Sequence, residues 1–291
     1  MTQLPADAHR PGDQPPRPRT IIITGASDGI GAAAARRFNA QNDRVVLVGR
    51  SPEKTAAIAR ELGADHYTAD FSRLDEVRDL AATLNSAYPQ IDVLANNAGG
   101  IMSEREVTTD GFEKTLQVNH LAPFLLTNLL MDTLVASQAK VITTASVAAK
   151  LFGNLDLDDL QLENRYSPNK AYGDAKLANI LFASELDRRF SPHGISSASF
   201  HPGTVATSFA ADSTSAMRFI YHTPLKHLVL VSPDKGANTL LWLANTTPGV
   251  DWKSGAFYTK RAIAATNPQA GDAALAARLW DLSAELVGLA R

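Results

Sequence analysis

The stretch TIIITGASDGIG, residues 20–31, joins a run of β-branched residues directly to a cluster of glycines. The run 20–24 predicts a short buried strand, and the Ala-rich run 30–40 predicts a helix. Glycine between them lets the backbone turn tightly and approach a pyrophosphate, while the helix offers free N–H groups and the positive end of its dipole. The spacing G-x-x-x-G-x-G is a variant of G-x-G-x-x-G, so the stretch predicts a dinucleotide-binding turn.

The rest of the chain repeats this alternation of strand and helix. Further strands are predicted at 44–48, 65–69, 91–95, 140–144 and 195–200, and helices at 52–62, 74–88, 112–138, 171–190, 235–244 and 273–287. Short apolar strands separated by long helices indicate βαβ units with right-handed crossovers. We therefore expect an α/β fold, a Rossmann-like doubly wound parallel sheet flanked by helices, in a single catalytic domain over residues 19–291.

Composition and charge narrow the function classes. The 291 residues carry a net charge of −2, which argues against a nucleic-acid partner. Cysteine is absent and the seven histidines are scattered, so we expect no disulfide and no metal site. Residues 1–18 are rich in proline and lack the apolar core of a secretory signal, so they predict a disordered tail. The apolar run 121–136 is too short to span a membrane, and we expect a cytoplasmic protein.

The end of the second predicted strand indicates which dinucleotide is bound. An NAD site usually places an acidic residue there to accept from the ribose 2′-OH, but this chain has Arg50 followed by Ser51. A guanidinium suits a 2′-phosphate, so the sequence predicts NADP(H), with Arg50 as the discriminating residue and Ser51 as a possible helper. The alternative is that Arg50 is a solvated loop residue.

Tyr172 and Lys176 lie four residues apart in a predicted helix, which places phenol and ammonium on one face. A free Tyr titrates near pH 10, and a nearby cation favours the phenolate and lowers the pKa. The pair would then exchange protons with a carbonyl or alcohol oxygen. The alternative is a half-buried Tyr beside a solvated Lys.

Taken together, these motifs resemble the short-chain dehydrogenase/reductase family over nearly all of the chain from residue 20 on. The resemblance implies cofactor contacts from Gly25, Ser27, Asp28, Gly29, Ile30, Gly31, Asp70, Phe71, Asn97, Ala98, Gly99, Tyr172, Lys176, Pro202, Gly203, Val205 and Thr207, beside Arg50. It also implies a catalytic set of Asn119, Ser146, Tyr172 and Lys176. In this set Ser146 holds the substrate oxygen, Tyr172 exchanges its proton, Lys176 assists Tyr172 and binds the nicotinamide ribose, and Asn119 holds a water.

Two segments, 119–127 and 171–186, are similar to retinol-dehydrogenase-like members of the family. That subgroup often carries a longer insertion between Ser and Tyr, here roughly 151–169 with an acidic run that predicts a solvated loop or a role in substrate choice. Two departures from the family pattern stand out. Ala175 replaces a frequent Ser, and the gap between Ser146 and Tyr172 is longer than is common in the family, which leaves Thr143 and Thr144 as alternative hydroxyls to Ser146.

The segment 209–231 is apolar and follows the nicotinamide motif, so it predicts a mobile substrate lid within about 204–233; a packed or subunit-contact helix is the alternative. We expect an NADP(H)-dependent oxidoreductase acting on the carbonyl or alcohol of a lipophilic small molecule. A silent NADP(H)-sensing regulator and a reductase of carrier-bound acyl chains are the competing hypotheses. The resemblance further implies a homodimer or homotetramer that pairs the helices 112–138 and 171–190.

Overall fold

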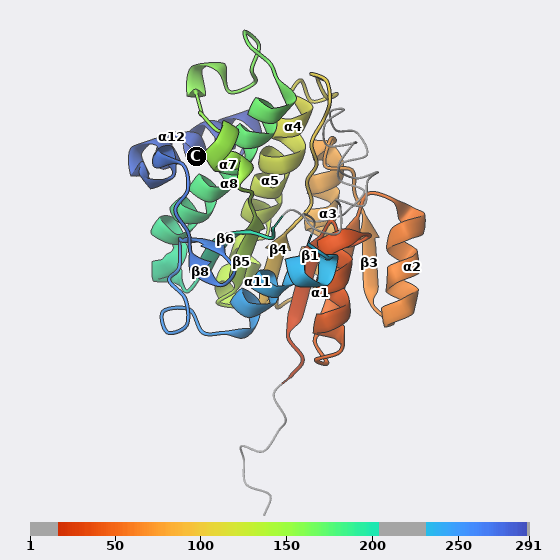
Figure 1. Cartoon of the computed structure of the whole chain (residues 1–291). Helices are drawn as coiled ribbons and strands as arrows, with labels where there is room; N and C mark the ends of the chain where they lie inside the picture. The colour runs from red at the N-terminus through yellow and green to blue at the C-terminus, as the bar shows by residue number, and fades with distance from the viewer. Residues whose placement is uncertain (1–16, 204–230, 290–291) are drawn as a thin grey trace, which may run out of the picture.

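A single twisted sheet runs through the computed structural model, which describes residues 17–203 and 231–289 (Figure 1). Within this part of the chain eight strands lie in the order β3-β2-β1-β4-β5-β6-β7-β8, parallel as far as β7, with β8 antiparallel to it. The strands are β1 (Thr20–Thr24), β2 (Arg44–Gly49), β3 (Asp65–Thr68), β4 (Val93–Asn96), β5 (Lys140–Thr144), β6 (Ser196–His201), β7 (Phe257–Thr259) and β8 (Ala262–Ile263). The expected doubly wound parallel sheet in one domain is confirmed.

The strand order reverses at β1, which pairs with β2 on one side and with β4 on the other. In open parallel sheets, ligands bind in the crevice beyond the carboxyl ends of the strands at such a switch point. The glycine turn after β1 and the residues after β4 therefore share the edge of the sheet where a cofactor is expected.

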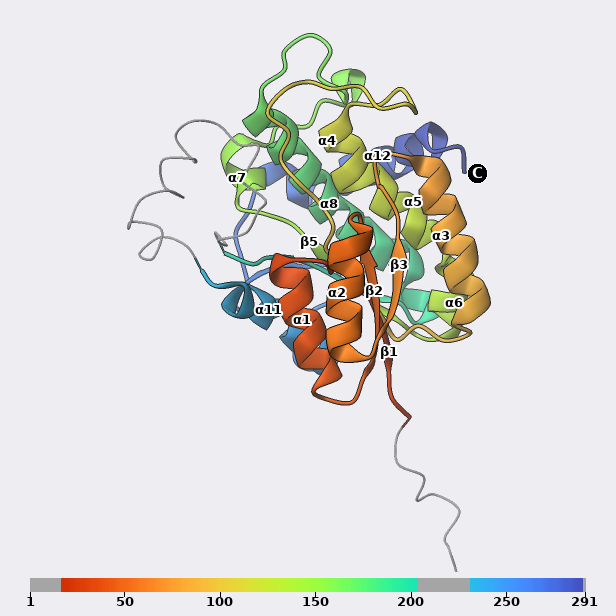
Figure 2. The same cartoon turned by 90° about the vertical axis from the view of Figure 1, so that its right-hand side faces the viewer.

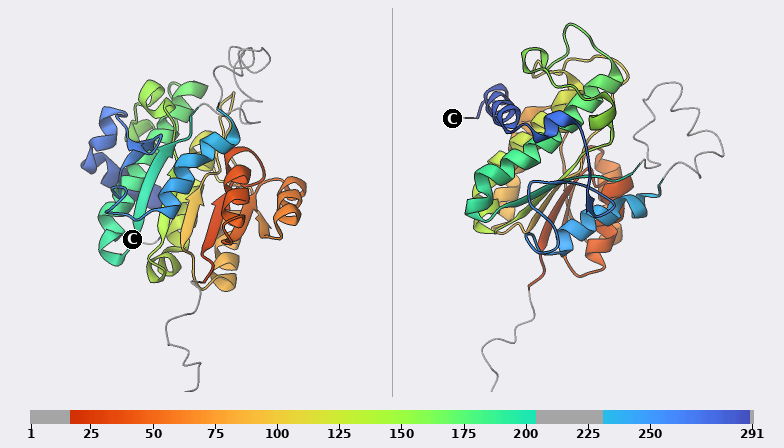
Figure 3. Two further views of the ribbon diagram at one scale, coloured as in Figure 1. Left: turned by 60° about the horizontal axis from the view of Figure 1, so that its bottom comes forward. Right: turned by 60° about the vertical axis from the view of Figure 1, so that its left-hand side comes forward.

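Helices cover both faces of the sheet because alternate strand residues point to opposite sides. Ile21 and Ile23 pack in the core beneath α1 (Gly29–Asn39) and α11 (Pro233–Asn245), whereas Ile22 packs in the core on the other face. The helices α1 and α11 lie side by side on the first face, with α2 (Pro52–Leu62) beyond α1 (Figure 2 and Figure 3). The second face is covered by α3 (Leu74–Ala87), α5 (Ala122–Leu129) and α8 (Pro168–Phe190).

The helix α12 (Ala273–Leu286) packs outside α8 and adds a further layer on the second face. Its Trp280 is buried, with its ring centroid 4.9 Å from that of Phe124 on α5 and 5.6 Å from that of Phe182 on α8. These aromatic contacts bind the end of the chain to the two helices that were expected to pair between subunits. The expected assembly remains a prediction.

The single helix predicted over 112–138 is wrong in detail, because the structure divides this region into four pieces. They are α4 (Lys114–Leu116), the π-helix η1 (Gln117–Leu121), α5, and α6 (Met131–Ala136). Glu113 stops the helix from starting earlier, since its carboxylate accepts hydrogen bonds from the N–H groups of Thr115 and Leu116. Leu130, at φ −94° and ψ 1°, separates α5 from α6. Within the described ranges, no helix has the length and apolar character needed to cross a bilayer.

Several predictions fall on residues 1–16 and 204–230, which lie outside the described residues. They include most of the predicted tail, almost all of the predicted lid, and the cofactor contacts assigned to Val205 and Thr207. Arg17, at the end of the predicted tail, is described, and its guanidinium pairs with Asp92 at 2.6 Å.

Candidate active site

The predicted site residues that the structure describes converge on one edge of the sheet. Most follow the carboxyl ends of the first six strands, and the others lie on η1 and α8. They are Gly25, Ser27, Asp28, Gly29, Ile30 and Gly31 after β1, Arg50 after β2, Asp70 and Phe71 after β3, Asn97, Ala98 and Gly99 after β4, Ser146 after β5, Pro202 and Gly203 after β6, Asn119 on η1, and Tyr172 and Lys176 on α8. Parallel strands end at one edge, so residues from distant parts of the chain meet there.

The glycine turn is packed closely against the loop that follows β4. Gly25 has φ +65°, and a Cβ on it would lie 2.8 Å from the Cα of Ala98. A Cβ on Gly31 would collide with the carbonyl oxygen of Gly25. Both positions therefore require glycine because the turn, the first helix and the β4 loop approach one another so closely.

The turn leads into α1, whose N-terminus lies at the same edge of the sheet. The carboxylate of Asp28 caps this helix by accepting from the N–H of Gly29 at 2.6 Å. Arg50 is exposed just beyond β2, and the carboxylate of Asp70, just beyond β3, accepts from the N–H and hydroxyl of Ser72 at 2.9 and 2.8 Å. A glycine turn that leads into a helix N-terminus at the switch point, with an exposed guanidinium nearby, fits a dinucleotide phosphate.

Phe71, predicted among the cofactor contacts, points its side chain into the hydrophobic core. Its side chain is only 5% exposed and belongs to the hydrophobic core under α3. Its carbonyl oxygen accepts from the side-chain amide of Gln117 at 3.3 Å. Only its backbone N–H is left to reach a cofactor.

Asn97 ties three strand ends together. Its side-chain amide donates to the carbonyl oxygen of Thr24 at 3.1 Å, and its side-chain oxygen accepts from the hydroxyl of Thr144 at 3.2 Å. The hydroxyl oxygen of Thr24 in turn accepts from the N–H groups of Asn97 and Ala98, both at 3.0 Å. This network fixes the ends of β1, β4 and β5 relative to one another at the edge of the sheet where the predicted site residues lie.

Asn119 lies in the π-helix, a local winding that often marks functional sites. Its side-chain amide donates to the carbonyl oxygens of Gly100 and Thr115, both at 2.8 Å, and its side-chain oxygen accepts from the N–H of Gly100 at 3.1 Å. A Cβ on Gly99 would lie 2.5 Å from this oxygen and 3.0 Å from Nζ of Lys176. Asn119 and Lys176 therefore meet over Gly99.

Lys176 is almost fully buried, at 2% exposure, and its Nζ donates to the carbonyl oxygen of Thr144 at 3.1 Å. The same Nζ lies 5.5 Å from the centroid of the Tyr172 ring, while Tyr172 is partly exposed. The alternative of a solvated lysine is therefore wrong. Burial lowers the pKa of Lys176 to about 7, because the ammonium loses its water.

Ser146 stands directly beyond β5, where its hydroxyl oxygen accepts from the N–H of Ala148 at 3.1 Å. Of the two alternative hydroxyls, Thr143 is 2% exposed and Thr144 donates to Asn97. Ser146 is partly exposed, so it is the hydroxyl of the three that is best placed for a bound molecule.

The sequence reasoning missed His201, the last residue of β6. Its Nδ1 accepts from the N–H of Val147 at 3.4 Å, which links the β6 end to the residue after Ser146. Burial lowers the pKa of His201, which favours the neutral ring that this acceptor role needs. Its position directly before the predicted Pro202-Gly203 motif is the sequence signal that could have placed His201 at the site.

The insertion predicted at 151–169 overlaps the end of an unpredicted short helix, α7 (Ala148–Phe152), contains the 3-10 helix η2 (Leu157–Asp159) within a loop, and ends in the first turn of α8. Its acidic residues stabilise turns: Asp156 accepts from the N–H of Asp158 at 3.0 Å, and Asp159 accepts from that of Glu163 at 2.8 Å. These contacts favour the interpretation of the acidic run as a loop.

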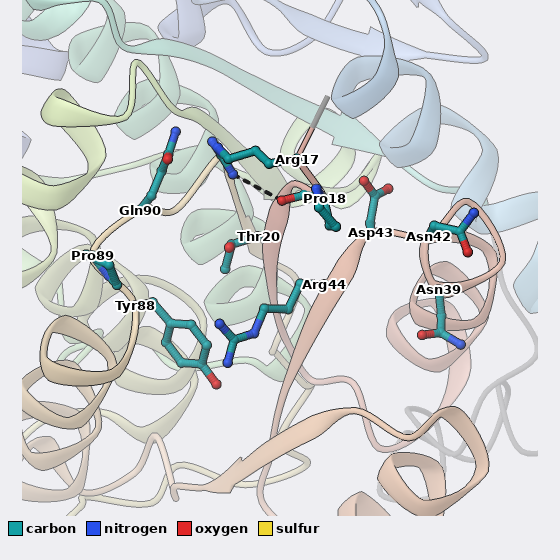
Figure 4. Close-up of a pocket in the computed structure, with 10 residues that line it drawn as sticks. All are labelled: Arg17, Pro18, Thr20, Asn39, Asn42, Asp43, Arg44, Tyr88, Pro89 and Gln90. Carbon is teal, nitrogen blue, oxygen red and sulfur yellow. Dashed lines mark hydrogen bonds between the residues drawn. The ribbon is translucent and has the colours of Figure 1, made fainter. Parts of the chain in front are cut away.

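An open hollow of about 700 Å³ lies at the opposite edge of the sheet, where the strands begin (Figure 4). Its two prominent cations, Arg17 and Arg44, already pair with Asp92 and Asp65. None of the residues predicted for catalysis or cofactor binding lines it. It is therefore a poor candidate for the active site.

Comparison with known proteins agrees with this arrangement. The family model described as short chain dehydrogenase matches residues 19–218. A Streptomyces sp. (strain C5) protein named "Putative daunorubicin C-13 ketoreductase DnrU" is 43% identical over 277 residues, covering 93% of each chain. Human retinol dehydrogenase 13 is 35% identical, covering 93% of this chain and 85% of its own. A crystal structure of a Mycobacterium paratuberculosis protein superposes with a TM-score of 0.74 at 33% identity, covering 93% of this chain and 94% of that one.

The matched region includes the glycine turn, the β4 loop, η1 and α8. With this extent of similarity and the sheet order described above, the chain belongs to the short-chain dehydrogenase family, in its retinol-dehydrogenase-like branch.

Proposed function

We propose that this protein is an NADP(H)-dependent oxidoreductase that interconverts a carbonyl and an alcohol on a lipophilic small molecule, with Tyr172 as the general acid and base. The observation that carries the proposal is the buried Nζ of Lys176, 5.5 Å from the centroid of the partly exposed Tyr172 ring. A cation held beside a phenol favours the phenolate, which a proton donor and acceptor at neutral pH requires.

The remaining residues hold the substrate and the proton. The bound nicotinamide would supply or accept the hydride. Ser146 donates a hydrogen bond to the substrate oxygen, and Tyr172 gives that oxygen a proton in reduction or takes it in oxidation. Asn119 connects Lys176 to the proton supply. General acid catalysis of this kind contributes roughly 10²–10⁴-fold to the rate.

The burial of Lys176 has a consequence for this mechanism. With a pKa of about 7, the free amine and the ammonium are similarly populated near neutral pH. A phenolate on Tyr172 would favour the ammonium form of Lys176, and the ammonium would favour the phenolate form of Tyr172.

Preference for NADP(H) is proposed from Arg50, whose exposed guanidinium follows the strand that carries a carboxylate in NAD sites. The hydroxyl oxygen of Ser51 caps α2 by accepting from the N–H of Lys54 at 3.4 Å, which leaves its own O–H to donate, so Ser51 stays the proposed helper. Arg50 is thus the side chain proposed to meet the 2′-phosphate.

A lipophilic substrate is proposed from the apolar surface beside Ser146. Val147, Leu151 and Phe152 are 40%, 62% and 44% exposed, and all three lie on or next to α7. The names of the similar proteins mention daunorubicin and retinol. An aromatic or isoprenoid ketone, aldehyde or alcohol is therefore the proposed substrate class, and a cytoplasmic location and a homo-oligomer remain predictions.

Replacement of the phenol tests the proposal. Tyr172→Phe removes only the hydroxyl, so we expect NADPH oxidation with a panel of aldehydes, ketones and quinones to fall at least 100-fold. NADPH affinity, measured by fluorescence titration, should stay within about threefold. Normal turnover by Tyr172→Phe would contradict the mechanism, and turnover only of carrier-bound ketones would instead support the acyl-chain alternative.

A further inference from the structure

The helix that follows Ser146 and the helix that carries Tyr172 touch through their backbones. A Cβ on Gly173 would lie 2.8 Å from the backbone nitrogen of Gly153 and 2.8 Å from Cβ of Phe152. The glycine next to Tyr172 therefore allows α7 to lie directly on α8. The separation between Ser146 and Tyr172 depends on how α7 is held in this contact.

Alone, α7 cannot hold itself there. It has five residues, and its N-cap residue Val147 makes no side-chain hydrogen bond to it, so only the hydroxyl of Ser146 accepts from its first N–H group, that of Ala148. A helix this short is unstable in isolation, and its last carbonyl groups need partners from elsewhere. On α8 itself, Asp174 accepts from the N–H of Asn154 and Lys170 donates to the carbonyl oxygen of Asn154, both at 2.7 Å. Further partners come from the far end of the chain, in the connection between β8 and α12 (Figure 1).

Asn267 supplies the first set of partners. Its side-chain amide donates to the carbonyl oxygen of Ala149 at 3.0 Å and to that of Gly153 at 2.7 Å. Asn267 is only 9% exposed, so water cannot easily replace these bonds. One buried amide thus closes the C-terminal end of α7.

Gln269 supplies the second set of partners, at Leu155, two residues after Gly153. Its side-chain amide donates to the carbonyl oxygen of Leu155 at 2.9 Å, and its side-chain oxygen accepts from the N–H of Leu155 at 2.9 Å. Its own N–H donates to the side-chain oxygen of Asn267 at 2.9 Å, so the two residues form one unit. This two-point contact resembles the pairing of adjacent strands and fixes the chain where it leaves α7.

We propose that Asn267 and Gln269 are positioning residues that hold the segment 147–155 on α8, and thereby set where Ser146 stands relative to Tyr172. This role rests on the proposed function, since it concerns the same two hydroxyl groups. Neither residue contacts the glycine turn, Asn97 or Arg50. The proposal therefore separates catalysis from cofactor binding: loss of the contacts should reduce turnover and leave NADPH affinity unchanged.

The isosteric change Asn267→Asp tests the role with little change of shape. A carboxylate cannot donate to the carbonyls of Ala149 and Gly153, whereas a protonated carboxyl group can donate to one of them. We expect kcat at pH 8 to fall about 10–100-fold, since misplacement by about 1 Å can cost 10²-fold. The dissociation constant for NADPH should stay within about twofold. The ratio of variant to wild-type kcat should rise as the pH is lowered from 8 to 6, because the carboxyl group regains its proton.

Two further variants keep the test decisive. Gln269→Glu removes the donor to the carbonyl oxygen of Leu155 and keeps the acceptor for its N–H, so it should lower kcat less than Asn267→Asp does. It also provides the test if Asn267→Asp fails to fold. Asn85→Asp is the matched control, because Asn85 also donates a side-chain amide to a backbone carbonyl, that of Leu129 at 2.9 Å. It should leave kcat and its pH profile unchanged.

Amide hydrogen exchange gives a readout independent of turnover. Asn267→Asp should speed exchange in 147–155 and leave 20–31 unchanged. Unchanged kcat in folded Asn267→Asp and Gln269→Glu, or a parallel loss of kcat and NADPH affinity, would overturn the positioning role. If the wild-type protein reduces no carbonyl, or if Tyr172→Phe is fully active, the proposed function fails. Faster exchange in 147–155 of Asn267→Asp would then show that the contacts of Asn267 and Gln269 are structural only.

Discussion

The close approach of Asn119 and Lys176 to Gly99 can be tested by adding one methyl group. In Gly99→Ala the new Cβ would lie 2.5 Å from Oδ1 of Asn119 and 3.0 Å from Nζ of Lys176. Gly99 does not have a positive φ, so the backbone conformation itself accepts alanine. The substitution therefore probes the space between the two side chains and not backbone strain.

The size of the effect follows from these distances. Ordinary van der Waals contact begins at 3.4 Å, so Asn119 must move by about 0.9 Å. Three hydrogen bonds to Gly100 and Thr115 hold its side chain in place, and Lys176 is fixed by Thr144. Misplacement of this size can cost about 100-fold in rate. Overpacking of a buried site costs about 1–3 kcal/mol in stability.

We therefore expect Gly99→Ala to lower kcat for a reactive ketone by about 30–100-fold, and to lower the melting temperature by about 2–10 °C. Turnover would be followed by NADPH absorbance and stability by thermal denaturation. Gly100→Ala is the matched control, because its Cβ would meet only Cε of Met102, at 3.5 Å. A Gly99→Ala protein with wild-type kcat and melting temperature would refute the packing of Asn119 and Lys176 against this glycine.

Three further perturbations address cofactor choice, proton linkage and packing. Arg50→Ala should lower the preference for NADPH over NADH at least tenfold in kcat/KM; an unchanged ratio would exclude the proposed role of the guanidinium. Lys176→Met should be more stable than wild type below pH 7 by urea denaturation, with the difference shrinking towards pH 10. Burial lowers the pKa of Lys176 from 10.5 to about 7, so in that window the unfolded wild-type chain binds a proton that the folded chain lacks, and wild-type stability rises with pH; a difference independent of pH would contradict this. Trp280→Ala should cost about 3–5 kcal/mol of unfolding free energy through the lost contacts with Phe124 and Phe182, and a loss below 1 kcal/mol would show that α12 is weakly attached.

Much of the fold was predictable because its signals are local. The strands β1 and β5 and the helix α2 have the predicted boundaries, since apolar runs, a Ser-Pro start and a Gly end mark them in the sequence. The positions of Tyr172 and Lys176 on one helical face follow from the four-residue spacing alone.

The features that escaped prediction depend on contacts distant in sequence. The helix α7 receives a hydrogen bond at Ala149 from Asn267, more than a hundred residues later, and the chain just beyond it is bonded at Leu155 by Gln269, so its own five residues carry little signal. The strand β7 has three residues, Phe257–Thr259, and is recognised as a strand through its pairing with β6 and β8. The helix predicted over 112–138 also changes to π winding at Gln117–Leu121, where Asn119 bonds Gly100, which lies 19 residues earlier.

The π-helix at Gln117–Leu121 limits how this part of the chain can vary. Removal of one residue just before Asn119 would restore regular winding and rotate its side chain by about 100° around the helix axis, away from Gly99. Substitutions of exposed residues in this segment leave the direction of the Asn119 side chain unchanged, whereas an insertion or deletion rotates it. Insertions and deletions among natural relatives should therefore accumulate in the loop after α7 and be absent between Lys114 and Asn119.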